Sequence, residues 1–115
     1  MLGSIRLPHY TYIGTTINLR DRLNAHNSGY GSSSTEPLFL RPFALLAYIS
    51  GFNGGRRDLR FWLENKWKER RDELINQGIV DPKELALCGN DIIQALTIQQ
   101  FGVSPSDLTL VCLFR

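Results

Sequence analysis

The stretch from Tyr10 to Gly29, YTYIGTTINLRDRLNAHNSG, constrains the fold more than any other part of the chain. Its pattern predicts a strand, a tight turn at Gly14 and a short helix over about residues 18–27. Asn18 is a residue type that caps helix starts, and Gly29 lies just past the end, where glycine commonly stops a helix. A strand that turns directly into a helix is typical of a sheet with helices packed on it.

The predicted helix carries polar and apolar side chains on neighbouring faces. Arg22 and His26 are four residues apart and therefore share one face. Leu19 and Leu23 have the same spacing and form an adjacent apolar stripe, which we expect to be buried. The helix thus presents a fixed cation and a titratable ring beside its packed side.

Strand-like patterns lie at residues 2–7 and 9–13, which can pair as a hairpin around Pro8, and at residues 43–49 and 108–114. The run at 43–49, FALLAYI, is continuous, which favours a central strand covered on both faces. Helix-like patterns lie at about 58–76, at 82–87, and from a cap at Asn90 or Asp91 to Gly102.

These elements predict an α/β (α+β) fold with a central, mostly antiparallel sheet of about three strands flanked by helices. The 115 residues are enough for one domain, residues 1–115, and too few for two separate cores. Two cysteines, Cys88 and Cys112, suit neither a disulfide scaffold nor a zinc site, so we expect free, buried thiols.

The sequence contains neither a membrane-spanning pattern nor a secretion signal. Its apolar runs are far shorter than the ~20 residues that cross a bilayer, and no basic-then-apolar segment opens it. We therefore expect a soluble, intracellular protein of the cytoplasm or nucleus.

The net charge of +2 says little about partners, but the cations are unevenly distributed. Seven crowd into one short segment: Arg56, Arg57, Arg60, Lys66, Lys68, Arg70 and Arg71. Such a cluster can attract a polyanion, yet the acidic residues interspersed with it favour a solvated helix face. The Gly- and Ser-rich segment 28–42 leaves a similar choice between a flexible surface loop and a phosphate-contacting loop.

Tyr10, Tyr12, Arg22 and His26 are candidate site residues on the strand–turn–helix unit. They have ordinary alternatives: Tyr12 as a core aromatic with a surface hydroxyl, the arginine as a solvated charge, the histidine in a local hydrogen bond. On spacing alone the ordinary alternatives are favoured.

Glu64 is a further candidate, and it is unusual because apolar residues precede it directly in the sequence. It follows Phe61-Trp62-Leu63, so its carboxylate lies near the margin of a buried helix face and needs a partner or a metal. Lys68, four residues later, is placed to pair with it in the favourable orientation.

The segment TYIGTT followed by NLRDRLNAHNSG resembles the second half of the GIY-YIG nuclease signature. Tyr12-Ile13-Gly14 matches its YIG element, Arg22 its catalytic arginine, and His26 a position that is often histidine. Arg41-Pro42-Phe43 and the strand after it are similar to the family's middle strand. LRFWLENKWK matches the helix that carries the single metal-binding glutamate, here Glu64. The resemblance covers roughly residues 8–70, and no family motif is transferred after about residue 78.

The first signature element, GIY, is not found on the strand before YIG. Gly3-Ser4-Ile5 is its nearest approximation and lacks the tyrosine. Two alternatives stay open: the sequence begins after that strand, or the element is lost. Tyr10, two residues before Tyr12 and on the same strand face, is then the candidate substitute.

The resemblance implies hydrolysis of a phosphodiester in DNA with one divalent metal. Glu64 would hold Mg²⁺ or Mn²⁺, Arg22 would bind the phosphate, and Tyr12 or Tyr10 would orient or deprotonate water with assistance from His26. Further candidate substrate contacts are Gly14, Ser32, Ser33, Arg41, Arg56, Arg57 and Arg60. The residues after about 78 would be an accessory helix–strand extension. The alternative is a weakened or inactive module of this type that binds nucleic acid or a partner protein.

Overall fold

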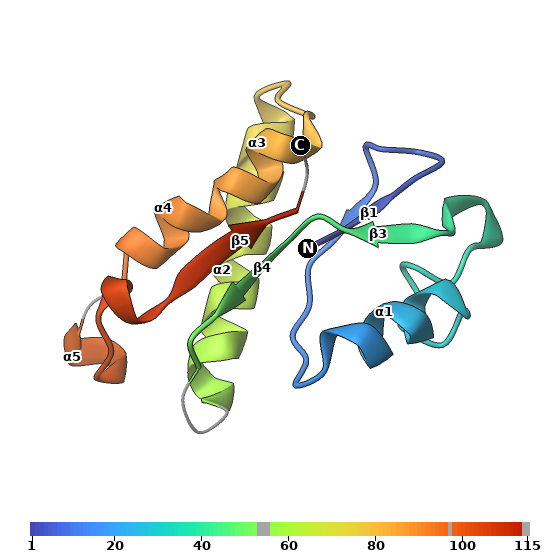
Figure 1. Ribbon diagram of the computed structural model, residues 1–115. Helices are drawn as coiled ribbons and strands as arrows, with labels where there is room; N and C mark the ends of the chain where they lie inside the picture. Colours follow the sequence, from blue (N-terminus) through green and yellow to red (C-terminus); the bar gives the residue numbers. More distant parts are fainter. Residues whose placement is uncertain (53–55, 97, 114–115) are drawn as a thin grey trace.

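The computed structural model describes residues 1–52, 56–96 and 98–113 (Figure 1). Its strands are β1 (Leu2–Ser4), β2 (Thr11–Tyr12), β3 (Phe43–Leu45), β4 (Ala47–Ser50) and β5 (Thr109–Cys112). Its α-helices are α1 (Leu19–Asn27), α2 (Arg57–Asn76), α3 (Pro82–Leu87), α4 (Gly89–Gln94) and α5 (Ile98–Phe101). Two short 3₁₀ helices, η1 (Leu38–Leu40) and η3 (Pro105–Asp107), lie in the connections.

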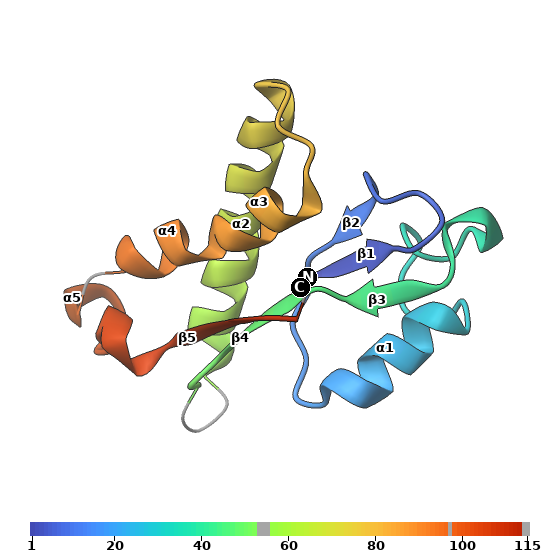
Figure 2. The same cartoon turned by 45° about the horizontal axis from the view of Figure 1, so that its top comes forward.

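The strands form two antiparallel sheets. The first has three strands in the order β2-β1-β3, and the second pairs β4 with β5. Helix α1 lies beside the three-stranded sheet, whereas α2, α3 and α4 gather around the two-stranded one (Figure 2). The predicted α/β fold with a small, mostly antiparallel sheet is confirmed in this form.

The predicted hairpin around Pro8 is confirmed, but its strands are short. The backbone N–H of Ser4 donates to Tyr10 O at 2.9 Å, and the N–H of Tyr10 donates to Leu7 O at 2.9 Å. These bonds close a turn, so β1 ends at Ser4 and β2 contains only Thr11 and Tyr12. Tyr10 therefore belongs to the turn and not to the strand that carries Tyr12.

The single covered strand predicted at residues 43–49 is wrong. The chain changes sheets at Leu46, between β3 and β4. The N–H of Leu46 donates to Met1 O at 2.9 Å, next to β1, while its carbonyl accepts from Leu113 N at 2.8 Å, next to β5. One residue thus bonds towards both sheets, and only Phe43 and Ala47 in this run are buried.

The predicted limits of α1 are confirmed. Asn18 Oδ1 accepts a hydrogen bond from the backbone N–H of Asp21 at 3.1 Å, which satisfies one free donor of the first turn. Gly29 has φ +84°, a conformation in which a side chain is strained, and it ends the helix. The predicted burial of the leucine stripe is only partly correct, because Leu19 is 40% exposed and Leu23 half-buried.

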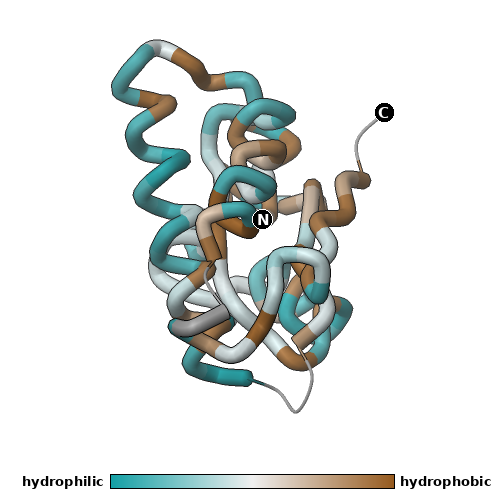
Figure 3. Tube along the Cα trace, turned by 90° about the vertical axis from the view of Figure 1, so that its left-hand side faces the viewer, coloured by the Kyte–Doolittle hydropathy of each residue, from teal (hydrophilic) through white to brown (hydrophobic). Residues whose placement is uncertain are grey.

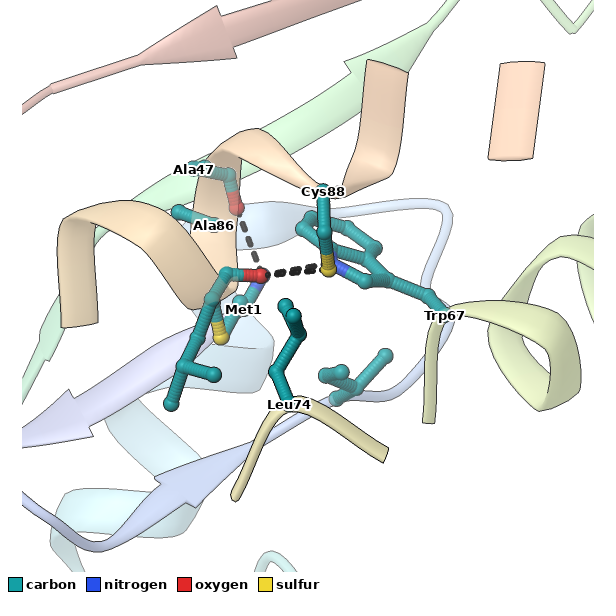
Figure 4. Close-up of a cluster of buried hydrophobic side chains, with 8 residues drawn as sticks. Met1, Ala47, Trp67, Leu74, Ala86 and Cys88 are labelled. Carbon is teal, nitrogen blue, oxygen red and sulfur yellow. Dashed lines mark hydrogen bonds between the residues drawn. The ribbon is translucent and has the colours of Figure 1, made fainter. Parts of the chain in front are cut away.

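The helical spacing of Leu59, Trp62, Leu63, Trp67 and Leu74 predicts the buried face of α2, and all of them are buried except Trp62, which is half-buried. Trp67 and Leu74 pack with Met1, Ala47, Ala86 and Cys88 in one core cluster (Figure 4). Trp67 Nε1 donates to Leu85 O at 3.0 Å, which satisfies the buried indole. Both cysteines are free thiols as predicted, although only Cys88 is buried, and burial raises its pKa to about 11.

The segments after α2 are short helices and a strand. Asp81 caps α3 by accepting from Lys83 N at 3.1 Å, as its position before a proline suggests. The single helix predicted from a cap at Asn90 or Asp91 to Gly102 is wrong, because α4 begins at Gly89 after Cys88 and ends at Gln94, and α5 is a separate helix. The predicted final strand is β5, paired with β4 through residues 109–112; Phe114, the end of that prediction, lies outside the described residues.

Hydrophobic and hydrophilic residues alternate along the trace, as expected for elements with one buried face (Figure 3). No helix in the described part of the chain is both long enough and apolar enough to cross a bilayer.

Candidate functional site

His26 is fully buried near the end of α1 and packs against Tyr12 of β2. The two ring centroids lie 4.4 Å apart, with the ring planes tilted by 53°. The predicted helix face shared by Arg22 and His26 is confirmed, because both side chains line one cavity, and the imidazole is in addition buried, with 0% of its surface exposed. The YIG tyrosine and the histidine are therefore one packed unit, although fourteen positions separate them in sequence.

The loop after α1 closes over the imidazole. Nδ1 of His26 lies 2.6 Å from Oγ1 of Thr35, whose side chain is also buried. Gly31 packs so tightly on the ring that a Cβ there would overlap with Nδ1 and Cγ of His26. Nε2, the other ring nitrogen, is buried and has no hydrogen-bond partner among the described residues.

Arg22 lies one turn before His26 on the same helix. Burial lowers the pKa of His26, and the positive charge of Arg22 lowers it further. Both effects disfavour the imidazolium. The ring is thus neutral near pH 7 and carries one protonated and one bare nitrogen.

Two adjacent cavities bring the remaining candidates together. One is lined by Tyr12, Arg22 and His26. The other is lined by Glu64 and Arg60 of α2 and by Tyr48 of β4. Both share the wall made by Met1, Gly14, Thr15, Thr16 and Leu19. The turn after the YIG segment therefore separates the cavity of Arg22 from the cavity of Glu64 and forms part of the wall of each.

Glu64 is paired with Lys68, the ordinary alternative that the sequence suggested. Lys68 Nζ lies 3.7 Å from Glu64 Oε2. The glutamate side chain is 15% exposed and the lysine side chain 39% exposed. The carboxylate is thus mostly covered, and its main ionic partner is at the solvent side.

The described residues contain no group of three or more His, Cys, Asp or Glu side chains arranged to hold a metal. Glu64 alone is nevertheless compatible with Mg²⁺ or Mn²⁺. Magnesium keeps several waters and is commonly held by one or two carboxylates together with substrate phosphates. Glu64 is a single carboxylate on the wall of a cavity adjacent to that of Arg22, so it could hold a metal together with water and substrate phosphate. It could not hold one in a site made of protein ligands alone.

Tyr10 and the loop serines lie outside the two cavities. Tyr10 is 53% exposed on the hairpin turn. Ser33 is exposed, whereas the hydroxyl of Ser32 bonds within its own loop, 3.0 Å from Ser34 Oγ and 3.3 Å from Thr35 Oγ1. The Ser-rich loop is therefore held together locally, with Thr35 at its buried centre.

Arg41 binds the end of α1. Its Nη1 donates to Asn27 O at 3.3 Å, and the Asn27 amide in turn bonds both the N–H and the carbonyl of Phe43. The predicted substrate contact thus helps to join the C-terminal end of α1, whose carbonyls attract cations, to β3.

The three arginines at the start of α2 differ in setting. Arg56 pairs with Asp58 at 3.2 Å and donates to Phe101 O at 2.8 Å. Arg57 lies over the ring of Phe61 at 5.2 Å. Of the three, Arg60 is the one that reaches the cavity of Glu64.

Sequence reasoning missed Thr35 and Gly31 on the histidine, and Tyr48 beside Glu64. Thr35 lies in a Ser-rich segment whose composition indicates only a loop. Tyr48 lies in a continuous apolar segment, which indicates a buried strand and not a site. Only the contact with His26 distinguishes Thr35 from the serines before it.

The model of the family described as GIY-YIG catalytic domain matches residues 4–76, which include both cavities' candidate side chains. The chain belongs to the GIY-YIG family. The resemblance carried by the YIG block and the glutamate helix is thereby confirmed. The GIY-YIG match ends at the C-terminal end of α2.

A similar protein is the "UPF0213 protein in ldhD 5'region" of Pediococcus acidilactici. It is 36% identical over 73 residues, which cover 60% of this chain and 72% of the relative. No solved structure matches the chain significantly. A nuclease-type GIY-YIG fold is thus established for residues 4–76.

Proposed function

We propose that this protein is a metal-dependent endonuclease that hydrolyses a phosphodiester bond of DNA. One observation carries the proposal: Tyr12, Arg22 and His26 line a cavity that shares a wall with the cavity of Glu64. A cation for phosphate, a neutral ring with a bare nitrogen and a carboxylate are then all close to one loop. These are the side chains that the GIY-YIG resemblance assigns to the reaction.

Arg22 would bind the scissile phosphate. Its planar guanidinium offers a fork of donors that matches two phosphate oxygens. The contact strengthens as negative charge builds on the nonbridging oxygens, so its main effect is on the transition state.

Tyr12 and His26 would handle the nucleophilic water. The oxygen of water forms a bond to phosphorus while the bond from phosphorus to the leaving oxygen breaks. The proton released by water passes to the Tyr12–His26 pair, and the leaving oxygen takes a proton from solvent. The imidazole is in contact with the phenol ring, and burial and Arg22 lower its pKa, so it is neutral and has a bare nitrogen available for the proton.

Glu64 would hold Mg²⁺ or Mn²⁺. When bound, the ion supplies positive charge that stabilises the leaving oxygen and the developing negative charge on the phosphate. The family's single-glutamate pattern agrees with the one carboxylate available on this wall.

The flanking cations would contact backbone phosphates. Arg60 in the cavity and exposed Arg57 at the start of α2 extend the positive surface from the site. Such contacts give affinity that falls with salt and no base readout. We further propose that the helices and strand after about residue 78 form an accessory extension, since β5 completes the sheet of β4 beside the site.

Nicking of supercoiled plasmid with and without Mg²⁺ tests the proposal. Parent protein should nick DNA only with the metal, and Glu64→Gln should abolish nicking while DNA affinity stays largely intact. Glu69→Gln, which removes the same charge from an exposed side chain of α2, is the matched control and should cleave normally. Cleavage that persists with chelator or in Glu64→Gln would contradict the mechanism.

A second function has one observation in its favour, the Glu64–Lys68 ion pair. A carboxylate already paired with lysine also suits a module that binds nucleic acid or a protein and does not cleave. Metal-independent DNA binding without any nicking by the parent protein would support that function instead.

A further inference from the structure

The hydrogen-bond chain behind His26 gives an inference that goes one step beyond the proposed reaction. Thr35 is buried, with 1% of its surface exposed, and its Oγ1 lies 2.6 Å from Nδ1 of His26. The same Oγ1 donates to the carbonyl oxygen of Ser32 at 3.3 Å. A carbonyl oxygen only accepts, so when the Thr35 hydroxyl donates to Ser32 O, the Thr35 oxygen is left to accept from Nδ1–H of His26.

We infer that Thr35 is a positioning residue that accepts a hydrogen bond from Nδ1–H of His26 and holds Nε2 bare. The proton chain then runs from Nδ1–H to the Thr35 oxygen and from the Thr35 hydroxyl to Ser32 O. The assignment of the tautomer depends only on this geometry. The catalytic role of the tautomer depends on the proposed function.

The surroundings of Nε2 favour the same tautomer. Nε2 is buried with no hydrogen-bond partner among the described residues. A buried N–H without an acceptor is rarer, and more unfavourable, than an acceptor without a donor. The opposite tautomer would place an unpaired N–H there, on the helix that also carries the Arg22 cation.

Packing keeps the ring in this orientation. Gly31 has no room for a Cβ against Nδ1 and Cγ, and the ring of Tyr12 covers His26 at 4.4 Å between centroids. The imidazole is thus confined by the loop and by β2. The acceptor nitrogen therefore has a direction that is fixed before substrate binds.

The tautomer of His26 can be read directly by ¹⁵N NMR. The chain has two histidines, so His9→Gln leaves His26 as the single imidazole. Long-range ¹H–¹⁵N correlation near pH 7.5 should show a protonated Nδ1 and a bare Nε2. Thr35→Val keeps the shape of threonine without the hydroxyl and should lose this pure tautomer, whereas Thr35→Ser should retain it. A protonated Nε2 in the parent, or an unchanged spectrum in Thr35→Val, would overturn the inference.

Nicking kinetics then separate this inference from the proposed function. Thr35→Val should lower kcat roughly tenfold to 100-fold with DNA affinity unchanged, within the range of general-base effects. Thr35→Ser should stay within about threefold of the parent, because serine offers the same hydroxyl. Should the parent fail to cleave DNA, the proposed function fails, and the spectrum alone still decides the tautomer. Full activity of Thr35→Val would contradict the positioning role.

Discussion

The ammonium of Lys68 lies 3.7 Å from the carboxylate of Glu64, the cavity-lining residue that we propose as the metal ligand. The pair is an i,i+4 contact on α2, in the orientation that helices favour. A bound divalent cation and the ammonium compete for one carboxylate. If Glu64 holds the metal as we propose, Lys68 should lower its affinity for that metal.

The first prediction follows from this competition. Lys68→Met should raise Mn²⁺ affinity about two- to fivefold, which corresponds to the ~0.5–1 kcal/mol of a partly exposed ion pair. Titration with Mn²⁺, followed by paramagnetic broadening of amide signals near Glu64, measures the change. Lys66→Met removes the same charge where it pairs with exposed Glu69 and should leave Mn²⁺ affinity unaltered. Equal affinities in parent and Lys68→Met would show that the ammonium does not oppose the metal.

The second prediction concerns Arg22 on α1. Arg22→Ala should lower the rate of nicking by about 100-fold or more, the loss seen when a transition-state donor is removed. Arg22→Lys keeps the charge without the planar fork and should recover only part of that rate. Single-turnover nicking at saturating protein separates this effect from binding.

Arg20 supplies the matched control, because it is an exposed arginine on the same helix. Arg20→Ala removes the same charge and should cleave within a few-fold of the parent. If Arg22→Ala also remained within a few-fold, Arg22 would not be part of the reaction.

The YIG segment illustrates how far sequence reasoning reaches. Asn18 and Gly29 are local signals, so the limits of α1 could be read from them and are confirmed. The orientation of His26 could not be read, because its burial depends on Thr35 and Gly31 in a loop whose composition suggests only flexibility. Spacing correctly placed His26 on the face of Arg22, but it gave no sign that the imidazole is buried against Tyr12.

The strand at residues 43–49 shows the same limit for the sheet. Continuous apolar residues indicate burial, and they do not show that the chain changes partners at Leu46. That change depends on Met1 and Leu113, far away in sequence. The basic residues of α2 also needed the structure, since Arg60 reaches the cavity while Arg56 bonds Asp58 and Phe101.

The third prediction tests the contact between Gly31 and the imidazole. Gly31→Ala should lower the free energy of unfolding by about 1–3 kcal/mol, because the added Cβ overlaps with a buried ring and the backbone beneath it. Urea unfolding followed by tryptophan fluorescence measures the loss. Ser33→Ala in the exposed part of the same loop should change stability little. An unaffected Gly31→Ala variant would mean that the loop does not press on His26.

The fourth prediction is a pH dependence of stability that originates at His26. Burial and then Arg22 lower the pKa of His26 below its ordinary value of 6.5, so the unfolded chain takes up this proton first. The contribution is present in full above about pH 6.5 and is lost as pH falls through the lower folded pKa. Its slope is at most ~1.4 kcal/mol per pH unit.

Parallel urea titrations between pH 7.5 and pH 5 isolate this contribution. His26→Gln removes the titrating ring, so its free energy of unfolding should fall less steeply with acid than that of the parent. The comparison uses the difference in slope, which cancels other groups that titrate in the same range, the buried Met1 amine with its pKa of about 5 among them. His9→Gln removes an exposed histidine and should reproduce the parent's slope. Identical slopes for the parent and His26→Gln would mean that folding leaves the pKa of the imidazole unchanged, which would contradict the effect assigned to burial and to Arg22.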